Sequence, residues 1–203
     1  MECKNKGENR MKLKSKDLIL IGIFTVLLYA VSLLVSFVAI VPVGTIISGA
    51  VYAVLAAPIY MLYISKIKKP FAITITGIFC SLMGLMSFTK ISIAVITFCF
   101  FVVADMIAGI KKYEDYRWNT LSYLVFSLWT LGIQGAYWYM QDYMVEMSLN
   151  SGMELAWLDA MVALATPFNF VVMVFATLAS ACIGCIFAKL LLKKHFRKAG
   201  ILK

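Results

Sequence analysis

The sequence predicts an all-α, polytopic membrane protein with six transmembrane helices and with both termini in the cytoplasm. Of its 203 residues, 63% are hydrophobic, and the mean hydropathy is +0.91, whereas a soluble domain is roughly 45–50% apolar. A globular chain of this size has too small a core to hide so much apolar surface, so lipid must cover part of it. The charged residues also fall in short blocks between long apolar runs, which is typical of membrane proteins.

Six apolar runs approach or exceed the roughly 20 residues that a spanning helix needs. Asp17 is expected to cap the start of the first run, and Pro58 predicts a kink in the second. The last run is too long for one span, and Pro167 is expected to divide it into an interfacial lead-in and a spanning part. The runs cover residues 17–40, 45–64, 71–88, 91–110, 118–139 and 160–192.

The organisation that follows is one membrane domain between two basic segments. Residues 1–16 form a basic cytoplasmic segment, residues 17–192 the six-helix domain, and residues 193–203 a basic cytoplasmic tail. The first run exceeds the 7–15 residues of a signal-peptide core, so we interpret it as a retained helix. A polar, acidic stretch at residues 140–159 is expected to lie outside the membrane.

The orientation is predicted by the distribution of basic residues. With six spans, the N-terminal segment, the links near residues 66–69 and 111–117, and the C-terminal tail share one side. Of the 19 Lys and Arg residues, only Lys90 falls on the other side. Such a bias places those segments in the cytoplasm, and it would be lost with five or seven spans.

The motif content argues against several function classes. The net charge of +9 does not indicate nucleic-acid binding, because the basic residues do not form a patch on a soluble fold. Walker A, HExxH and GxSxG motifs are absent, so we expect no intrinsic enzyme activity and no cofactor. Cys182 and Cys185 form a CxxC motif inside an apolar run without a second ligand pair, so we expect packing residues rather than a metal or redox site.

Small residues recur every four positions in three of the runs, which allows close helix packing in lipid. Packing within the protein is the favoured explanation of such ladders, and docking to a partner subunit is the alternative. The ladders are Ala176, Ser180, Gly184 and Ala188; Ala72, Thr76, Cys80 and Gly84; and Gly22 and Ala30, with Val26 between them.

Two ionisable residues lie in or beside the spans, where each is a functional-site candidate. Asp105 lies near the cytoplasmic end of the fourth run, and pairing with loop lysines is the favoured explanation. Lys90 lies at the outer end between the third and fourth runs. It either extends to the interface or holds an anionic or carbonyl group of a ligand.

The fifth run carries the strongest signal for a ligand site. Gln134 is costly in lipid and should face the protein interior or a cavity. The aromatic residues near it form either an interfacial belt or a stacking wall for a small molecule. Asn169 is expected at a similar depth, with the outer stretch around Trp157 as a cover. The candidate substrate-binding residues are Lys90, Trp129, Gln134, Tyr137, Trp138 and Asn169.

A resemblance to a known family adds to this interpretation. The sequences KDLILIGIFT at residues 16–25, ADMIA at 104–108 and YLVFSLWT at 123–130 resemble substrate-binding S components of energy-coupling factor (ECF) transporters. The closest subgroup is the MptD-type, or Trep_Strep, S components. The resemblance covers nearly the whole chain, although its motifs are short and hydrophobic.

The resemblance implies a transport function in the plasma membrane of a prokaryote. S components bind a micronutrient from outside and deliver it with a transmembrane T component and two ATP-binding subunits. In the family, small residues on the first helices contact the T component, which assigns docking to Gly22, Val26 and Ala30. Val26 interrupts the expected alanine repeat.

Other function classes remain open on the sequence. A small membrane enzyme, for example one acting on lipid head groups, would need converging acids, His or Ser in the spans. A channel would need long polar stripes, which are absent. A solitary carrier or a purely structural role is compatible with the sequence.

Overall fold

The structure is a computed structural model that describes residues 13–86 and 90–196, and the described residues form helices without any β-strand. Nearly the whole described chain is helical because every apolar run must satisfy its backbone groups internally in lipid. The elements are α2 (Ser15–Ser36), η1 (Phe37–Ile40), α3 (Pro42–Lys66), α4 (Ala72–Met86), α5 (Ile91–Gly109), α6 (Tyr116–Ser127), α7 (Trp129–Gln134), α8 (Ala136–Tyr139), α9 (Gln141–Asn150), α10 (Leu155–Leu164), α11 (Pro167–Leu191) and the π-helix η2 (Leu192–Phe196).

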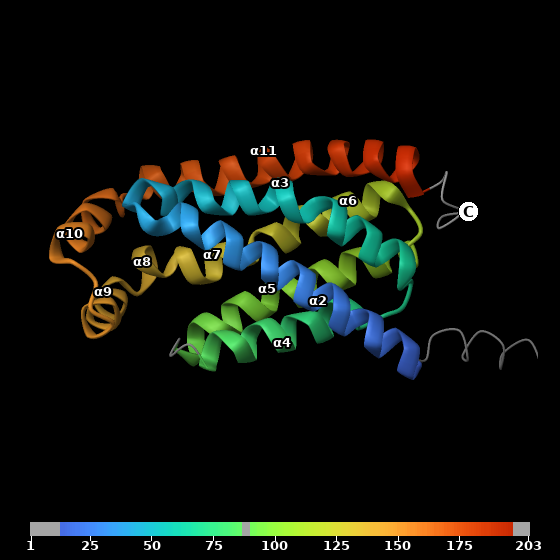
Figure 1. The fold of residues 1–203 in the computed structure, drawn as a ribbon, viewed down its shortest axis with the longest axis horizontal. Helices are drawn as coiled ribbons and strands as arrows, with labels where there is room; N and C mark the ends of the chain where they lie inside the picture. Colours follow the sequence, from blue (N-terminus) through green and yellow to red (C-terminus); the bar gives the residue numbers. More distant parts are fainter. Residues whose placement is uncertain (1–12, 87–89, 197–203) are drawn as a thin grey trace, which may run out of the picture.

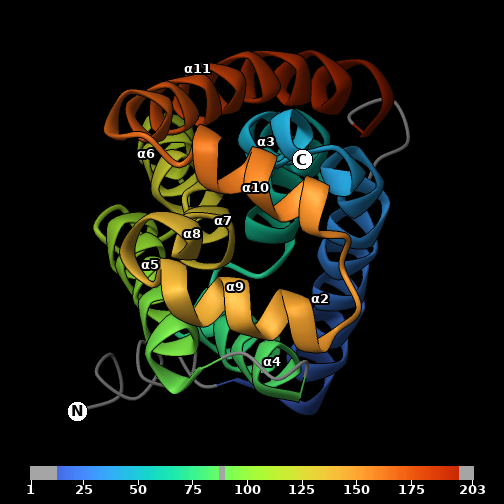
Figure 2. The ribbon, with the colours of Figure 1, turned by 90° about the vertical axis from the view of Figure 1, so that its left-hand side faces the viewer.

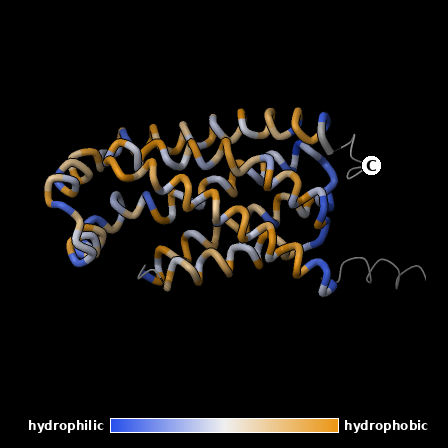
Figure 3. The backbone as a smooth tube through the Cα atoms, in the orientation of Figure 1, coloured by the Kyte–Doolittle hydropathy of each residue, from blue (hydrophilic) through white to orange (hydrophobic). Residues whose placement is uncertain are grey.

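The long elements run back and forth along one bundle axis, and the short helices α9 and α10 lie together at one end (Figures 1 and 2). The start of α2 and the end of α11 lie at the opposite end (Figure 1). Hydrophilic backbone segments gather at both ends, and apolar segments occupy the middle (Figure 3). We name the end with α9 and α10, whose exposed acids include Asp142 and Glu154, the acidic end. The opposite end, with Lys66 and Lys69, is the basic end.

Four of the six predicted spans are helices long and apolar enough to cross a membrane. They are Ser15–Ile40, Pro42–Lys66, Ile91–Gly109 and Pro167–Lys194. The third predicted span corresponds to α4, a shorter apolar helix of 15 residues; Phe88, its expected end, lies outside the described residues. The fifth is broken at Leu128 and Gly135 into α6, α7 and α8. A count of six spans therefore stays a prediction, as does the side of the membrane on which the termini lie.

Two prolines were predicted to shape the helices. Pro58 lies inside α3, and a kink there stays a prediction. Pro167 begins α11 after the separate helix α10, which confirms the predicted division of the last run. Thr166 caps α11 by accepting a hydrogen bond from the backbone N–H of Asn169, as expected for a helix that starts with proline.

The predicted cap of the first helix is wrong by three positions. Lys14 occupies the N-cap position, and Asp17 lies in the first turn of α2. The Asp17 carboxylate accepts a hydrogen bond from the Lys14 backbone N–H at 2.8 Å and forms an ion pair with Lys69 at 2.5 Å. A carboxylate in the first turn stabilises the positive end of the helix dipole, and here it also ties α2 to the link before α4.

The ladder of small residues on α11 packs inside the protein. Gly184 faces α3 so closely that a Cβ atom there would lie 2.7 Å from the Ala53 carbonyl oxygen and 2.8 Å from the Ala57 Cβ. Ala188 on the same face is completely buried. Because the side chains are small, the backbones of α3 and α11 approach closely. The resulting van der Waals contacts hold the helices together in lipid, where the hydrophobic effect does not drive helix association.

Near the basic end, buried polar groups pair with one another inside an aromatic core. Tyr60 and Ser122 share a hydrogen bond of 2.7 Å, and the Tyr63 hydroxyl donates to the Ala72 carbonyl oxygen. The Tyr60 ring packs against Phe126 with 4.4 Å between ring centroids. Paired polar groups add directional bonds to apolar packing and hold α3, α4 and α6 in register.

Candidate functional site

A cavity of about 420 Å³ lies toward the acidic end of the bundle. Its volume is within the range of small-molecule sites, which are mostly apolar with a few convergent polar groups. Six elements form its wall: α2, η1, α3, α4, α7 and α9. The lining residues are Tyr29, Ser32, Leu33, Val35, Ser36, Ala39, Tyr52, Cys80, Met83, Gly84, Trp129, Thr130, Ile133, Gln134, Met144 and Met147.

The broken fifth run positions the deepest part of this wall. The break at Leu128 separates α7 from α6, and α7 packs closely against α5. A Cβ atom at Gly132 would clash with the Thr97 side chain on α5, so only glycine permits this approach. The short helix α7 then presents Trp129, Thr130 and Gln134 to the cavity.

The polar atoms of the wall are only partly satisfied. Gln134 Nε2 donates to Ser48 Oγ at 2.6 Å, whereas Gln134 Oε1 and Trp129 Nε1 are buried without hydrogen-bond partners. Buried polar groups normally find a partner, and each unpaired one costs about 1–3 kcal/mol. Unpaired groups beside a cavity are consistent with a site whose partner is a ligand.

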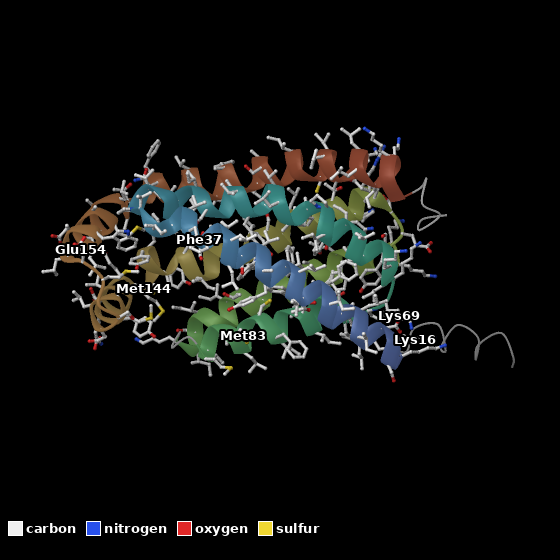
Figure 4. The ribbon with its side chains drawn as sticks, in the orientation of Figure 1. Lys16, Phe37, Lys69, Met83, Met144 and Glu154 are labelled. Carbon is white, nitrogen blue, oxygen red and sulfur yellow. The ribbon has the colours of Figure 1, made fainter. Side chains whose placement is uncertain are left out.

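The cavity wall contains no charged side chain. Asp142, Glu146 and Glu154 are exposed to solvent, and Figure 4 shows Glu154 beyond Met144 at the acidic end, with Lys16 and Lys69 at the opposite end. Among the described residues, no group of three His, Cys, Asp or Glu is placed to hold a metal ion. The site therefore offers apolar surface and neutral hydrogen-bonding groups.

Helix α9 covers the cavity at the acidic end. Met144 and Met147 of α9 line the cavity, while Asp142 and Glu146 on the same helix are exposed. Methionine side chains are flexible and adapt to differently shaped partners. An amphipathic helix with methionines toward the cavity and acids toward solvent is suited to closing over a ligand.

Four of the six predicted site residues do not line the cavity: two of them contact α9, and two bind the α10–α11 junction. Lys90 Nζ lies 4.2 Å from the centre of the Tyr143 ring on α9, and Tyr137 shares a hydrogen bond of 2.9 Å with Ser148. Trp138 Nε1 donates to the Thr166 carbonyl oxygen at 2.7 Å. Asn169 Nδ2 donates to the Leu164 carbonyl oxygen, so Asn169 fixes the α10–α11 junction and does not face Gln134 across a common space.

Trp129 and Gln134 are the two predicted site residues that line the cavity. Trp157, which was expected in the cover, does not line this cavity; its Nε1 donates to the Ile40 carbonyl oxygen at 2.7 Å. This bond ties α10 to the end of η1. Whether Trp129 and Gln134 contact a substrate stays a prediction.

The predicted site lacked two sets of lining residues. Ser32 and Ser36 repeat at a spacing of four on α2, and both line the cavity. A pair of hydroxyls on one face of an otherwise apolar run was the available signal. Met144 and Met147 carried no such signal in the polar stretch at 140–159, of which only Trp157 was named as a cover.

Asp105 does not pair with lysines among the described residues. Its carboxylate accepts hydrogen bonds from the Thr74 backbone N–H at 3.0 Å, the Thr74 hydroxyl at 2.7 Å and the Tyr113 hydroxyl at 2.6 Å. Thr74 lies in the first turn of α4, where backbone N–H groups lack helical partners. Burial raises the pKa of the Tyr113 hydroxyl, and the neighbouring Asp105 carboxylate raises it further. The hydroxyl therefore stays protonated and donates its hydrogen bond to Asp105. Asp105 therefore joins α4, α5 and the link after α5, far from the cavity.

The predicted docking residues lie on the outer surface of α2. Val26 is 68% exposed, Ala30 is exposed, and a Cβ atom at Gly22 would meet nothing within 4 Å. Unlike the ladder on α11, this face does not pack within the described part of the chain.

Comparison with known proteins gives a family and no function. Residues 15–198 match the model of a family described as a hypothetical bacterial integral membrane protein (Trep_Strep). The match covers most of the chain, and the protein belongs to this family. No curated protein and no solved structure matches the chain significantly.

Proposed function

We propose that this member of the bacterial Trep_Strep membrane family is the substrate-binding subunit of an ECF-type importer. It captures a small molecule from outside the cell and delivers it with a T component and two ATP-binding subunits. The observation that carries the proposal is the cavity of about 420 Å³, covered by α9 at one end of a bundle whose other end is solidly packed.

The charge distribution supports capture from the outside. Basic residues at the start of α2, the end of α3 and the end of α11 mark the cytoplasmic side under the positive-inside rule. The acidic end then faces outward in the plasma membrane of the bacterium. With this orientation, the cavity lies in the outer half of the bundle, and α9 separates it from external water.

The absence of ATP-binding motifs in the sequence supports a subunit that depends on partners. Transport against a gradient needs an energy source, and this chain carries no phosphate-binding loop. Gly22, Val26 and Ala30 on the outward face of α2 offer a surface where a second membrane protein approaches the backbone closely. We assign the T component to this face.

Affinity purification in mild detergent tests the proposal. The tagged chain is purified from its natural host, and co-purifying proteins and small molecules are identified by mass spectrometry. We expect a T component and paired ATPases. Ala30→Leu should reduce their recovery, whereas Ala179→Leu, on the exposed face of α11, is the matched control and should not.

The alternative outcomes are informative. Clean recovery of the chain alone, from cells that express such a module, would refute the importer assignment and favour a solitary carrier. Equal loss of partners with Ala30→Leu and Ala179→Leu would refute the docking face on α2 and leave the importer assignment standing.

A further inference from the structure

We propose that the cavity binds a neutral, predominantly apolar molecule that carries a hydrogen-bond acceptor such as a carbonyl oxygen. The inference rests on the proposed function, because it names the class of substrate for the same cavity. Its basis is the apolar chemistry of the wall, one buried donor and one buried acceptor without partners, and the absence of charged side chains from the lining.

The wall is built to bury apolar surface. Leu33, Val35 and Ile133 supply aliphatic surface, and Met83, Met144 and Met147 supply thioether side chains from α4 and α9. Figure 4 shows Met83 on α4 and Met144 on α9 in the same part of the bundle. Apolar contact area contributes roughly 25 cal/mol per Å², so an apolar ligand gains most from this wall.

A charged ligand would meet no partner in this cavity. None of the lining side chains is Lys, Arg, His, Asp or Glu. Burying an unpaired carboxylate or ammonium costs several kcal/mol even after relaxation. Lys90 lies over the Tyr143 ring of α9 and does not line the cavity.

One buried donor of the wall, the indole N–H of Trp129, has no partner of hydrogen-bond geometry. The Tyr52 hydroxyl lies next to it. The two rings meet edge to face with 5.4 Å between centroids. An indole nitrogen only donates, so this contact does not use the proton of the Tyr52 hydroxyl. A carbonyl oxygen between them would accept from both.

The available acceptors favour a ligand that also donates. Ser32 and Ser36 donate their hydroxyl protons to the backbone carbonyls of Tyr29 and Leu33, which leaves oxygen lone pairs toward the cavity. Gln134 Oε1 is a further unpaired acceptor. A carboxamide, which both accepts and donates without carrying charge, matches this set.

Labelling of Cys80, a cavity residue, tests the exclusion of charge on the full chain in lipid nanodiscs. Three methanethiosulfonate reagents share one reaction and differ in charge: methyl (neutral), sulfonatoethyl (anionic) and trimethylammonioethyl (cationic). Peptide mass spectrometry separates Cys80 from the other cysteines. We expect the neutral reagent to modify Cys80 at least tenfold faster than either ion, and Ser32→Cys to give the same order.

A matched pair of probes tests the acceptor and the charge of the ligand. 1-Naphthylacetamide should slow the labelling of Cys80, and 1-naphthylacetate, its anionic counterpart, should not. Tyr52→Phe, which removes one donor, should weaken protection by the amide several-fold. Leu34→Cys, which is 66% exposed on the lipid side of α2, is the control, and its labelling should not respond to either probe.

Three outcomes would overturn the inference: comparable labelling by a charged reagent at Cys80 and Ser32→Cys, protection by the acid, or protection by neither probe. None of these measurements requires a partner protein. Charge-selective labelling of a chain that fails to recover a T component would therefore support the ligand class and refute the importer. Recovery of a T component by a chain whose labelling is not charge-selective would support the importer and refute the ligand class.

Discussion

The same hydrogen-bonded pair occurs at both ends of the bundle in different surroundings. Tyr60 and Ser122 are 2.7 Å apart near the basic end, and Tyr137 and Ser148 are 2.9 Å apart at the acidic end. The first pair joins α3 to α6 beside the main core, to which Tyr60 belongs. The second joins α8 to α9 in a separate small cluster around Ile93 and Met161.

The difference indicates which part of the molecule is built to move. Near the basic end, Asp105, Thr74 and Tyr113 connect three segments by hydrogen bonds, and breaking one contact leaves buried groups unpaired. At the acidic end, α9 rests on a few bonds above a cavity. Segments with few buried contacts open at lower free energy than the core, so the cover is expected to open while the rest of the bundle stays intact.

The largest expected effect of a substitution is at Asp105. Asp105→Leu removes the acceptor for three donors and should lower the free energy of unfolding by about 3 kcal/mol or more, since each unpaired buried donor costs about 1–3 kcal/mol. Asp105→Asn, which keeps one acceptor oxygen, should lose less. Thermal unfolding followed by size-exclusion chromatography in detergent measures both. Wild-type stability of Asp105→Leu would show that this network does not hold the basic end.

Gly184→Val should have the second-largest effect on stability. The new side chain would collide with the backbone and side chains of α3, and overpacking of this kind costs about 1–3 kcal/mol. Ala179→Val, on the exposed face of α11, is the control and should unfold with the wild type. If both variants unfold alike in the same thermal assay, the close contact of α3 and α11 does not limit stability.

Tyr137→Phe and Tyr60→Phe compare the two pairs directly. Each loses one hydrogen bond, worth about 1 kcal/mol. We expect Tyr137→Phe to speed amide hydrogen exchange in residues 141–150 without lowering the melting temperature. Tyr60→Phe should lower the melting temperature and leave exchange in α9 unchanged. Identical exchange patterns in the two variants would contradict an independently opening cover.

The smallest effect is expected for Lys90→Met. The ammonium group of Lys90 lies over the Tyr143 ring, an interaction worth about 0.5–1 kcal/mol at an exposed site. Its loss should raise exchange in α9 slightly and leave binding of 1-naphthylacetamide unchanged, because Lys90 does not line the cavity. Loss of probe binding would instead show that Lys90 contacts the ligand, which is one of the two roles that the sequence predicts for it.

The ends of the elements could be predicted better than their contacts. The division at Pro167 was predicted because proline acts on the local backbone. The helix α9 was missed, since a polar stretch has no long apolar run to mark it. Gln134 was placed at the cavity because an amide in an apolar run must face the interior.

The four predicted site residues that do not line the cavity show the limit of predicting a site from the depth of residues in the membrane. Lys90, Tyr137 and Trp138 were grouped with Gln134 because they were expected on the outer side, and Asn169 because it was expected at a similar depth. Depth follows from the number of residues along a helix. The direction of a side chain around that helix depends on which neighbour packs against it, and the break in the fifth run changed those directions.

By itself, the sequence determined that this protein lies in a membrane, where its apolar runs begin and end, and which ends of those runs carry the basic residues. These are local properties, set by hydropathy, proline and charge along the chain. Only the tertiary structure decided that Tyr52, Ser32 and the α9 methionines share a cavity with Trp129 and Gln134, while Asp105 closes a network elsewhere. The reason is physical: such contacts join residues far apart in the chain, and helix packing rather than local preference brings them together.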